Sequence, residues 1–206
     1  EANDLGMTRM AVSVNAASAA RVGDFERAIR WAELHGDLSD GVRILGESEV
    51  VVSLALARLQ RGNVREAAQL LRSSEYEGVA NRYAASVQAL VCAMMRQSDE
   101  VERLAAMVAG TGTYLDQIFA LWALTLDRSR RGDDGGAAEA LAQAHEVVSK
   151  TDDRLTLGYQ RILLALVTGS DPEPAANAVR AYGVNPAGWH LLFERVLARV
   201  APAEAG

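Results

Sequence analysis

The chain of 206 residues is poor in cysteine, proline, aromatic residues and lysine, and these shortages narrow the choice of protein class. Its single cysteine, Cys92, excludes an intramolecular disulfide and a cysteine-rich metal site, and it fits a reducing compartment such as the cytoplasm. Lys150 is the one lysine among 21 basic residues, a bias typical of GC-rich bacterial genomes. All four prolines lie in the last fifth of the chain, so most of the sequence holds no residue that must interrupt a helix.

The sequence also lacks long apolar runs, an excess of positive charge and the motifs of common enzymes. No apolar run reaches about 18 residues, so we expect no membrane span, and we expect no signal peptide before the first helix. The net charge of −6 argues against direct binding to nucleic acid. No HExxH, Walker or nucleophile-elbow motif occurs, and the pair His190 and Glu194 is too small a ligand set for a metal. We therefore expect no enzyme, no cofactor and no metal.

A short phrase recurs along the chain. Its clear copies begin at Gly23, Gly62 and Gly132, a weaker copy begins at Gly169, and a worn copy lies near Ser98. Each clear copy separates two alanine-rich stretches in which apolar residues recur at helical spacing. Glycine tolerates the left-handed conformation that ends a helix, and the polar residue after it can cap the next helix. Successive copies begin 34 to 39 residues apart, and a repeat of this length predicts a stack of helix pairs.

The apolar periodicity predicts eleven helices and no strand, arranged as five antiparallel pairs and one last helix. We expect a single domain over residues 8–200, preceded by a flexible lead-in at 1–7 and followed by a tail at 201–206. The expected repeats and the last helix cover residues 8–46, 47–82, 83–113, 114–151, 152–183 and 188–200.

The phrase Gly-Asp-aromatic-x-x-Ala, which Gly23–Ala28 matches in full, resembles the tetratricopeptide repeat when it stands between two helices. In that family a small residue of the first helix packs on an alanine of the second. The matching pairs in this chain are Ala16 with Ala28, Ala55 with Ala67, and Thr125 with Ala137. The resemblance implies an all-α fold in which antiparallel helix pairs stack as a right-handed superhelix of about eleven helices. The family's usual Trp and Tyr and its closing proline are absent, and most repeats exceed the standard length, which suggests a divergent bacterial type.

The resemblance also implies a binding site, because the first helices of this family line a concave groove that binds proteins or peptides. The polar and aromatic residues that would line it are Arg21, Gln60, Gln88, Arg96, Trp122, Arg130 and Tyr159. The three arginines would form one rung of the groove and suit a partner with acidic groups. The competing interpretation is structural, since an arginine near a helix end faces the negative end of the dipole and Trp122 can be core.

The last helix carries an apolar stripe that includes Trp189 and Phe193. We expect this stripe to cap the fifth repeat, and the alternative is an exposed face that forms a homodimer or meets another domain. Cys92 is either a buried small side chain or a thiol whose pKa is lowered by Arg96. The sequence thus predicts a cytoplasmic module that binds a protein or peptide. The alternative is a ligand-sensing or oligomerisation region of a larger bacterial transcriptional or signalling regulator.

Overall fold

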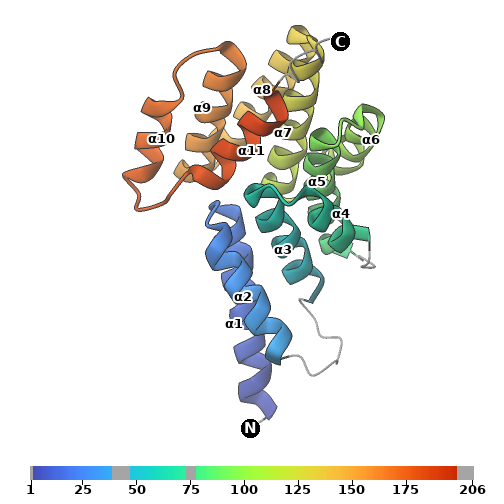
Figure 1. Cartoon of the computed structure of the whole chain (residues 1–206), viewed down its shortest axis with the longest axis vertical. Helices are drawn as coiled ribbons and strands as arrows, with labels where there is room; N and C mark the ends of the chain where they lie inside the picture. The colour runs from blue at the N-terminus through green and yellow to red at the C-terminus, as the bar shows by residue number, and fades with distance from the viewer. Residues whose placement is uncertain (1, 39–46, 73–77, 199–206) are drawn as a thin grey trace, which may run out of the picture.

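The chain folds into α-helices throughout the part that the computed structural model describes, which is residues 2–38, 47–72 and 78–198 (Figure 1). These residues form eleven helices and no strand, as the sequence predicts. The helices are α1 Ala2–Arg21, α2 Phe25–Leu38, α3 Glu47–Arg61, α4 Val64–Arg72, α5 Gly78–Met94, α6 Ser98–Val108, α7 Tyr114–Arg131, α8 Asp134–Ser149, α9 Arg154–Thr168, α10 Glu173–Arg180 and α11 Ala187–Leu197.

The first ten helices pack as five consecutive pairs, each of which contacts the next pair along the chain. Within a pair the two helices lie against each other, and both of them also contact the first helix of the following pair. Alanines make this close approach possible, and the three small-residue pairs named above are completely buried. The exception is the last step, where α7 and α9 make few direct contacts because α11 packs against both (Figure 1).

Several helix starts differ from the sequence-based expectation, among them that of α5, which begins at Gly78 inside the expected second repeat. Helix α1 begins at Ala2, so the expectation of a flexible lead-in is wrong for residues 2–7. Gly6 lies inside this helix, where it costs about 1 kcal/mol relative to alanine without ending the helix. Helix α8 begins at Asp134, three residues before the alanine at which the apolar pattern predicts its start, because the Asp133 side chain accepts a hydrogen bond from the Gly136 amide at 2.9 Å and caps the helix. The expected tail at 201–206 lies outside the described residues.

The turns between paired helices share one backbone geometry. Each contains a left-handed residue, and these residues are Gly23, Gly62, Arg96, Gly132 and Gly169. In every case the amide of the left-handed residue and the amide that follows it bond to carbonyls of the last helical turn. These two hydrogen bonds satisfy carbonyls that the helix end would otherwise leave without a donor. The recurring phrase in the sequence is therefore the signature of a recurring helix stop.

The third turn shows why its copy of the phrase looked worn. Arg96 takes the place of glycine, with φ of 61°, and its amide bonds to the Ala93 carbonyl at 3.2 Å. Gln97 follows, and its amide bonds to the Cys92 carbonyl at 2.9 Å. The turn therefore lies two residues earlier than the expected start at Ser98, which is instead the first residue of α6. Without a glycine to mark it, the register of the third repeat could not be read correctly.

We predict that Arg96→Gly stabilises the protein. The left-handed conformation costs a residue with a Cβ about 1–2 kcal/mol, and glycine removes this cost. Glycine also increases the entropy of the unfolded chain, which destabilises the folded state by about 0.5–1 kcal/mol, so we expect a net gain of roughly 0.5–1 kcal/mol. Urea unfolding followed by circular dichroism measures the change. The matched control is Arg65→Gly at an exposed position of α4, which should lose about 1 kcal/mol. Equal or lower stability of Arg96→Gly would contradict the strain at this turn.

Candidate functional site

The wall formed by the first helices of the pairs is covered by the last helix of the chain. Helix α11 packs against α3, α5, α7 and α9, and it crosses in front of α7 in Figure 1. The expected cap on the fifth repeat is thus only part of its role, since α11 contacts α9 and three other first helices. The surface that the family resemblance predicts to be an open groove is occupied from within the chain.

An aromatic cluster holds α11 in this position. Trp189 and Phe193 of α11 meet Phe119 and Trp122 of α7 and Tyr159 of α9, and all five side chains are buried. The centroid of the Trp189 ring lies 4.9 Å from that of Phe119 and 5.0 Å from that of Trp122. Tilted and edge-on ring pairs at these separations add about 0.5–1.5 kcal/mol each beyond the burial of apolar area. The cluster therefore makes α11 part of the core.

The end of α1 is tied to the same cluster through backbone carbonyls. The indole N–H of Trp189 donates to the Arg21 carbonyl at 2.8 Å, and the Tyr159 hydroxyl donates to the Val22 carbonyl at 2.5 Å. The last carbonyls of a helix lack partners within the helix, so these side chains satisfy them. A Cβ on Gly188 would clash with the carbonyl of Gly23, so glycine permits the close approach of α11 to the first turn. The first pair, α9 and α11 are thereby joined directly.

Three residues expected to line an open groove lie in the core instead. Trp122 donates its indole N–H to the Gln160 side chain, and Tyr159 bonds to the end of α1. Gln60 is buried and donates to the Ala20 carbonyl at 2.9 Å. The prediction of an exposed wall is therefore wrong for these three side chains. Gln88 is half-buried on α5.

The expected rung of three arginines is also not formed. Arg21 pairs with Glu49 at 3.3 Å and lies over the ring of Tyr83, with its Cζ 5.1 Å from the ring centroid. Arg130 pairs with the buried Asp127 at 2.5 Å. Arg96 belongs to a turn rather than to the matching helical position, as the corrected register shows. The structure thus uses two of the three arginines in internal ion pairs, which removes the basis for an acidic-ligand rung.

The alternative interpretation of the last helix, an exposed interface, is wrong for Trp189 and Phe193. Trp189 and Phe193 are completely buried, so they cannot form the surface of a homodimer. No signal in the sequence distinguished a stripe that caps one pair from a stripe that contacts four helices. On the same helix His190 Nε2 lies 3.5 Å from a Glu194 carboxylate oxygen. In the part of the chain that the structure describes, no three His, Cys, Asp or Glu side chains group as a metal site.

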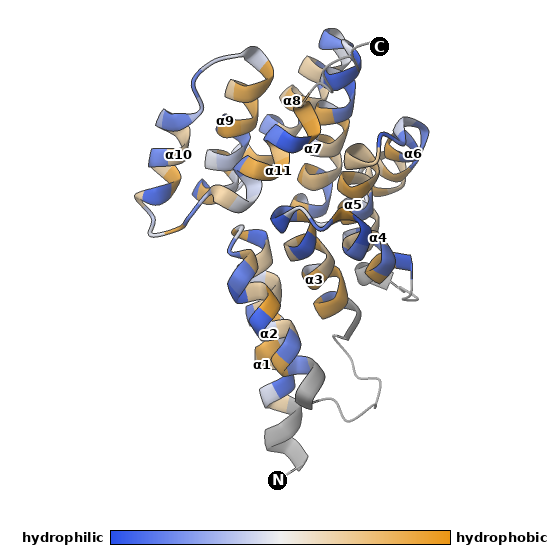
Figure 2. Ribbon diagram, viewed as in Figure 1, coloured by the Kyte–Doolittle hydropathy of each residue, from blue (hydrophilic) through white to orange (hydrophobic). Residues whose placement is uncertain are grey.

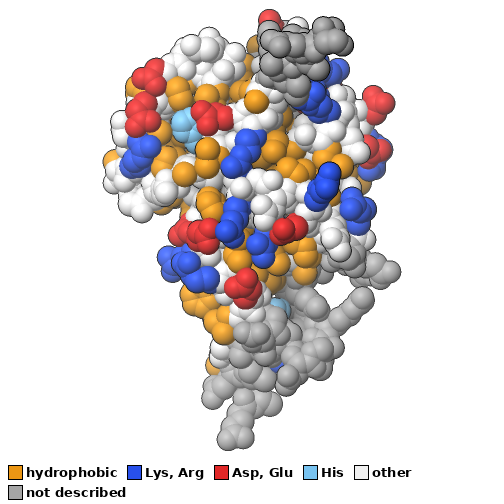
Figure 3. Space-filling model, viewed as in Figure 1, with side chains coloured by type: hydrophobic (Ala, Val, Ile, Leu, Met, Phe, Trp, Pro, Cys, Tyr) orange, Lys and Arg blue, Asp and Glu red, His pale blue; other side chains and the backbone are white. Residues whose placement is uncertain are grey.

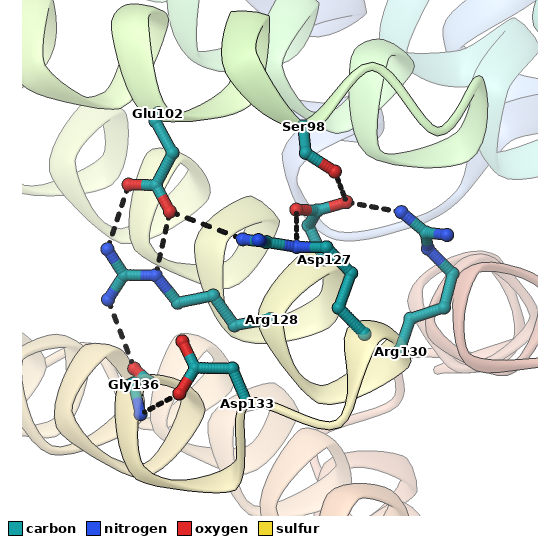
Figure 4. A network of polar contacts seen from close by, with 8 residues as sticks. Ser98, Glu102, Asp127, Arg128, Arg130, Asp133 and Gly136 are labelled. Atoms are coloured by element: carbon teal, nitrogen blue, oxygen red, sulfur yellow. Dashed lines mark hydrogen bonds and ion pairs between the residues drawn. The ribbon is translucent and has the colours of Figure 1, made fainter.

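A network of charged side chains connects α6, the second helix of the third pair, to α7, the first helix of the fourth pair (Figure 4). Asp127 of α7 is buried and accepts hydrogen bonds from the Ser98 hydroxyl at 3.0 Å and from Arg131 at 2.9 Å, in addition to its pair with Arg130. Glu102 of α6 accepts two hydrogen bonds from the guanidinium of Arg128, at 2.8 and 2.9 Å. Bidentate pairs of this kind fix geometry as well as charge. The network is a structural clamp between two neighbouring pairs.

Each first helix has one face directed at the preceding pair, which we call its incoming face. Two polar contacts identify this face. Gln160 of α9 donates a hydrogen bond to the Leu141 carbonyl of α8, and Asp127 of α7 accepts one from the Ser98 hydroxyl of α6. These contacts use positions 5 and 9 residues before the left-handed residue of the turn. In α3, α5 and α7 these two positions, and the position 12 residues before the left-handed residue, are buried. They are Val50, Ser53, Ala57, Ala84, Val87, Val91, Ala120, Ala123 and Asp127.

The incoming face of α1 is exposed and mainly apolar. The positions equivalent to the buried ones are Ala11, Val14 and Ser18, and Met7 and Met10 extend the same stripe at helical spacing. Met10 is 64% exposed and Val14 is 57% exposed. Figure 3 shows hydrophobic side chains at the surface over the α1–α2 pair. We call these five residues the α1 face; four of them are apolar, and an exposed apolar stripe of this kind is typical of an interaction surface.

The one thiol of the chain is not poised for chemistry. Cys92 is buried on α5, and burial raises the pKa of its thiol to about 11, with a further increase from the Glu100 carboxylate. Of the two interpretations of Cys92, the buried small side chain is confirmed, and a pKa lowered by Arg96 is wrong. None of the described helices combines the length and hydropathy needed to cross a bilayer. No protein-family model, curated protein or solved structure matches this chain.

We predict that Trp189→Ala lowers the free energy of unfolding by about 3–5 kcal/mol, because it empties the centre of the aromatic cluster. It also removes the donor to the Arg21 carbonyl. Chemical denaturation with near-ultraviolet circular dichroism measures the loss. Leu191→Ala on the exposed side of the same helix is the control and should change stability by about 0.5 kcal/mol or less. Similar losses for both variants would mean that α11 does not depend on the cluster.

We also predict that native Cys92 reacts with a disulfide reagent at pH 8 about a hundredfold more slowly than the unfolded chain, since two pKa units separate the thiols. The folded state retains its thiol proton between pH 9 and 11, so stability should fall as the pH rises through this window. Cys92→Ala should remove that part of the pH dependence. Native and unfolded thiols that react equally fast at pH 8 would contradict the effect of burial.

Proposed function

We propose that this chain is a helical-repeat module that binds another polypeptide through the α1 face. The observation that carries the proposal is the contrast between α1 and its equivalents. The incoming faces of α3, α5 and α7 are buried against a preceding helix pair, whereas the incoming face of α1 is exposed. The resemblance to the tetratricopeptide repeat supports a role in protein binding. Since α11 fills the concave wall, the proposal rests on the end of the stack and not on a groove.

The partner that fits the α1 face is a helix pair with an apolar outer surface. Inside the chain each buried incoming face is covered by both helices of the pair before it. Helices pack by inserting side-chain ridges into grooves, so an α1 face of methionine, valine, alanine and serine suits a similar helical surface. Methionine adapts its shape to varied partners, which favours recognition at this position.

The last helix pair of a second copy does not offer the matching surface. The last pair, α9 and α10, would have to present the outgoing face that covers an incoming face elsewhere in the stack. In this chain Tyr159 of α9 is hydrogen-bonded to the Val22 carbonyl, and α11 covers part of α9. Helix α10 mixes hydrophilic and hydrophobic residues (Figure 2), and its Glu173, Asn177 and Arg180 are exposed. We therefore assign the partner to a helix pair outside residues 1–206 rather than to the last pair of a second copy.

The test is site-specific photo-cross-linking combined with surface variants. A photoreactive residue at Val14 should cross-link to a helical segment of a partner in cells that express the protein, and the same residue at Ala178 on exposed α10 should not. Met10→Glu with Val14→Glu should weaken binding of the purified partner by at least tenfold, because charges would enter an apolar contact. Both positions are exposed, so the stability of the variant should change by about 0.5 kcal/mol or less.

Three outcomes would overturn the proposal. The first is equal cross-linking from Val14 and Ala178, which would indicate random collisions. The second is a cross-link from Val14 to another copy of this chain, which would replace the assigned partner with self-association. The third is a partner whose affinity is unchanged by the double glutamate variant, which would place its binding surface elsewhere.

A further inference from the structure

A second surface feature lies at the step from α8 to α9, far along the chain from the α1 face. An open groove of about 580 Å³ lies between these two helices. Its walls are mainly aliphatic, with Leu141, Ala138 and Ala142 on α8 and Leu164 and Val167 on α9. Leu164 is 46% exposed, although its equivalents in α3, α5 and α7 are buried. Sites for small molecules typically have volumes of about 300–1,000 Å³ and apolar walls, which is the range of this groove.

The charged clamp of the preceding step is missing at this groove. Between α6 and α7, Glu102 pairs with Arg128 and Arg131. Glu102 lies six residues after the left-handed Arg96, and the residue six positions after the left-handed glycine of the next turn is Ala138. Ala138 therefore takes the place of Glu102 between α8 and α9. In the same way, Ala165 and Thr168 take the places of the two arginines. Short neutral side chains thus replace a charged clamp at the step from α8 to α9.

The polar groups around the groove are unevenly distributed. Among the residues that line the groove, His145 is the last on α8, and Gln160 and Arg161 at the middle of α9 are the first on that helix, so these side chains stand toward one end of the groove. Asp134, the first residue of α8, and Thr168, the last of α9, stand toward the opposite end. The cationic group of Arg161 therefore lies at one end of an aliphatic channel, apart from the acidic group.

The inner wall of the groove offers little polar recognition of its own. Gln160 lines it, but its carbonyl oxygen accepts the indole N–H of Trp122 and its amide nitrogen donates to the Leu141 carbonyl at 2.9 Å. A ligand in the channel would thus meet aliphatic side chains along its length and a charged group at the rim. The same hydrogen bond connects the groove wall to Trp122 in the core, which provides a spectroscopic reporter.

We propose that the groove between α8 and α9 binds a small amphiphile with an aliphatic tail and one carboxylate. The tail lies along Leu141, Leu164 and Val167, and the carboxylate pairs with Arg161 at the rim. The opposite charge of Arg161 and a carboxylate selects an anionic head over a cationic one. This site is separate from the α1 face, so each can fail without the other.

The experiment uses decanoate as the probe, below its micelle concentration, with the full chain labelled with ¹⁵N. Decanoate should shift the indole resonance of Trp122 and give a saturable heat in calorimetry. Decyltrimethylammonium, which has the same tail and a cationic head, should bind more weakly, and acetate should not bind. Arg161→Ala should weaken decanoate binding about threefold, as expected for an exposed ion pair, whereas Arg154→Ala at an exposed position of α9 should not.

Leu164→Glu tests the channel itself. The side chain is partly exposed, so the variant should fold, and its charge in the channel should weaken decanoate binding by at least tenfold. Retained helical circular dichroism verifies the fold, and Arg161→Ala gives an independent variant. The proposal is overturned if decanoate leaves the Trp122 resonance and the heat unchanged. It is equally overturned if the cationic amphiphile binds as well as decanoate, or if Leu164→Glu binds like the unmodified chain.

Discussion

The docking of α11 on the aromatic cluster is the contact on which the tertiary arrangement depends. Trp189 joins three parts of the chain that are far apart in sequence, since it packs on α7, contacts Tyr159 of α9 and donates to the end of α1. A stack of helix pairs by itself needs contacts only between neighbours. This chain adds a long-range closure, and a buried indole makes it specific because its N–H must find a partner.

The closure divides the molecule into regions with different availability for binding. The wall formed by the first helices is covered by α11, so the side chains that line it contribute to stability. The incoming face of α1 and the groove between α8 and α9 remain exposed; no helix pair precedes α1 among the described residues, and the groove lacks the charged clamp found between α6 and α7. Both exposed regions are places where a contact made elsewhere in the stack is not made.

The turns and helices could be predicted from residues close together in the sequence. Glycine at a left-handed position, a polar residue after it and apolar residues at helical spacing all act within a few residues of one another. Where one of these local signals was missing, as at Arg96, the prediction slipped by two residues. The expected site fared less well, because the exposure of Trp122 or Gln60 depends on whether a distant helix covers it.

The amino-acid sequence by itself therefore determined the helical class, the number of helices and the pairing of neighbours, since backbone hydrogen bonds and helix stops are short-range interactions. Only the tertiary structure decided where α11 lies, which arginines are used in internal ion pairs and which apolar faces stay uncovered. An aliphatic or aromatic stripe has the same pattern whether it faces one helix, four helices or solvent. Its partner is chosen by the packing of the whole chain, where shape and burial combine over residues far apart in sequence.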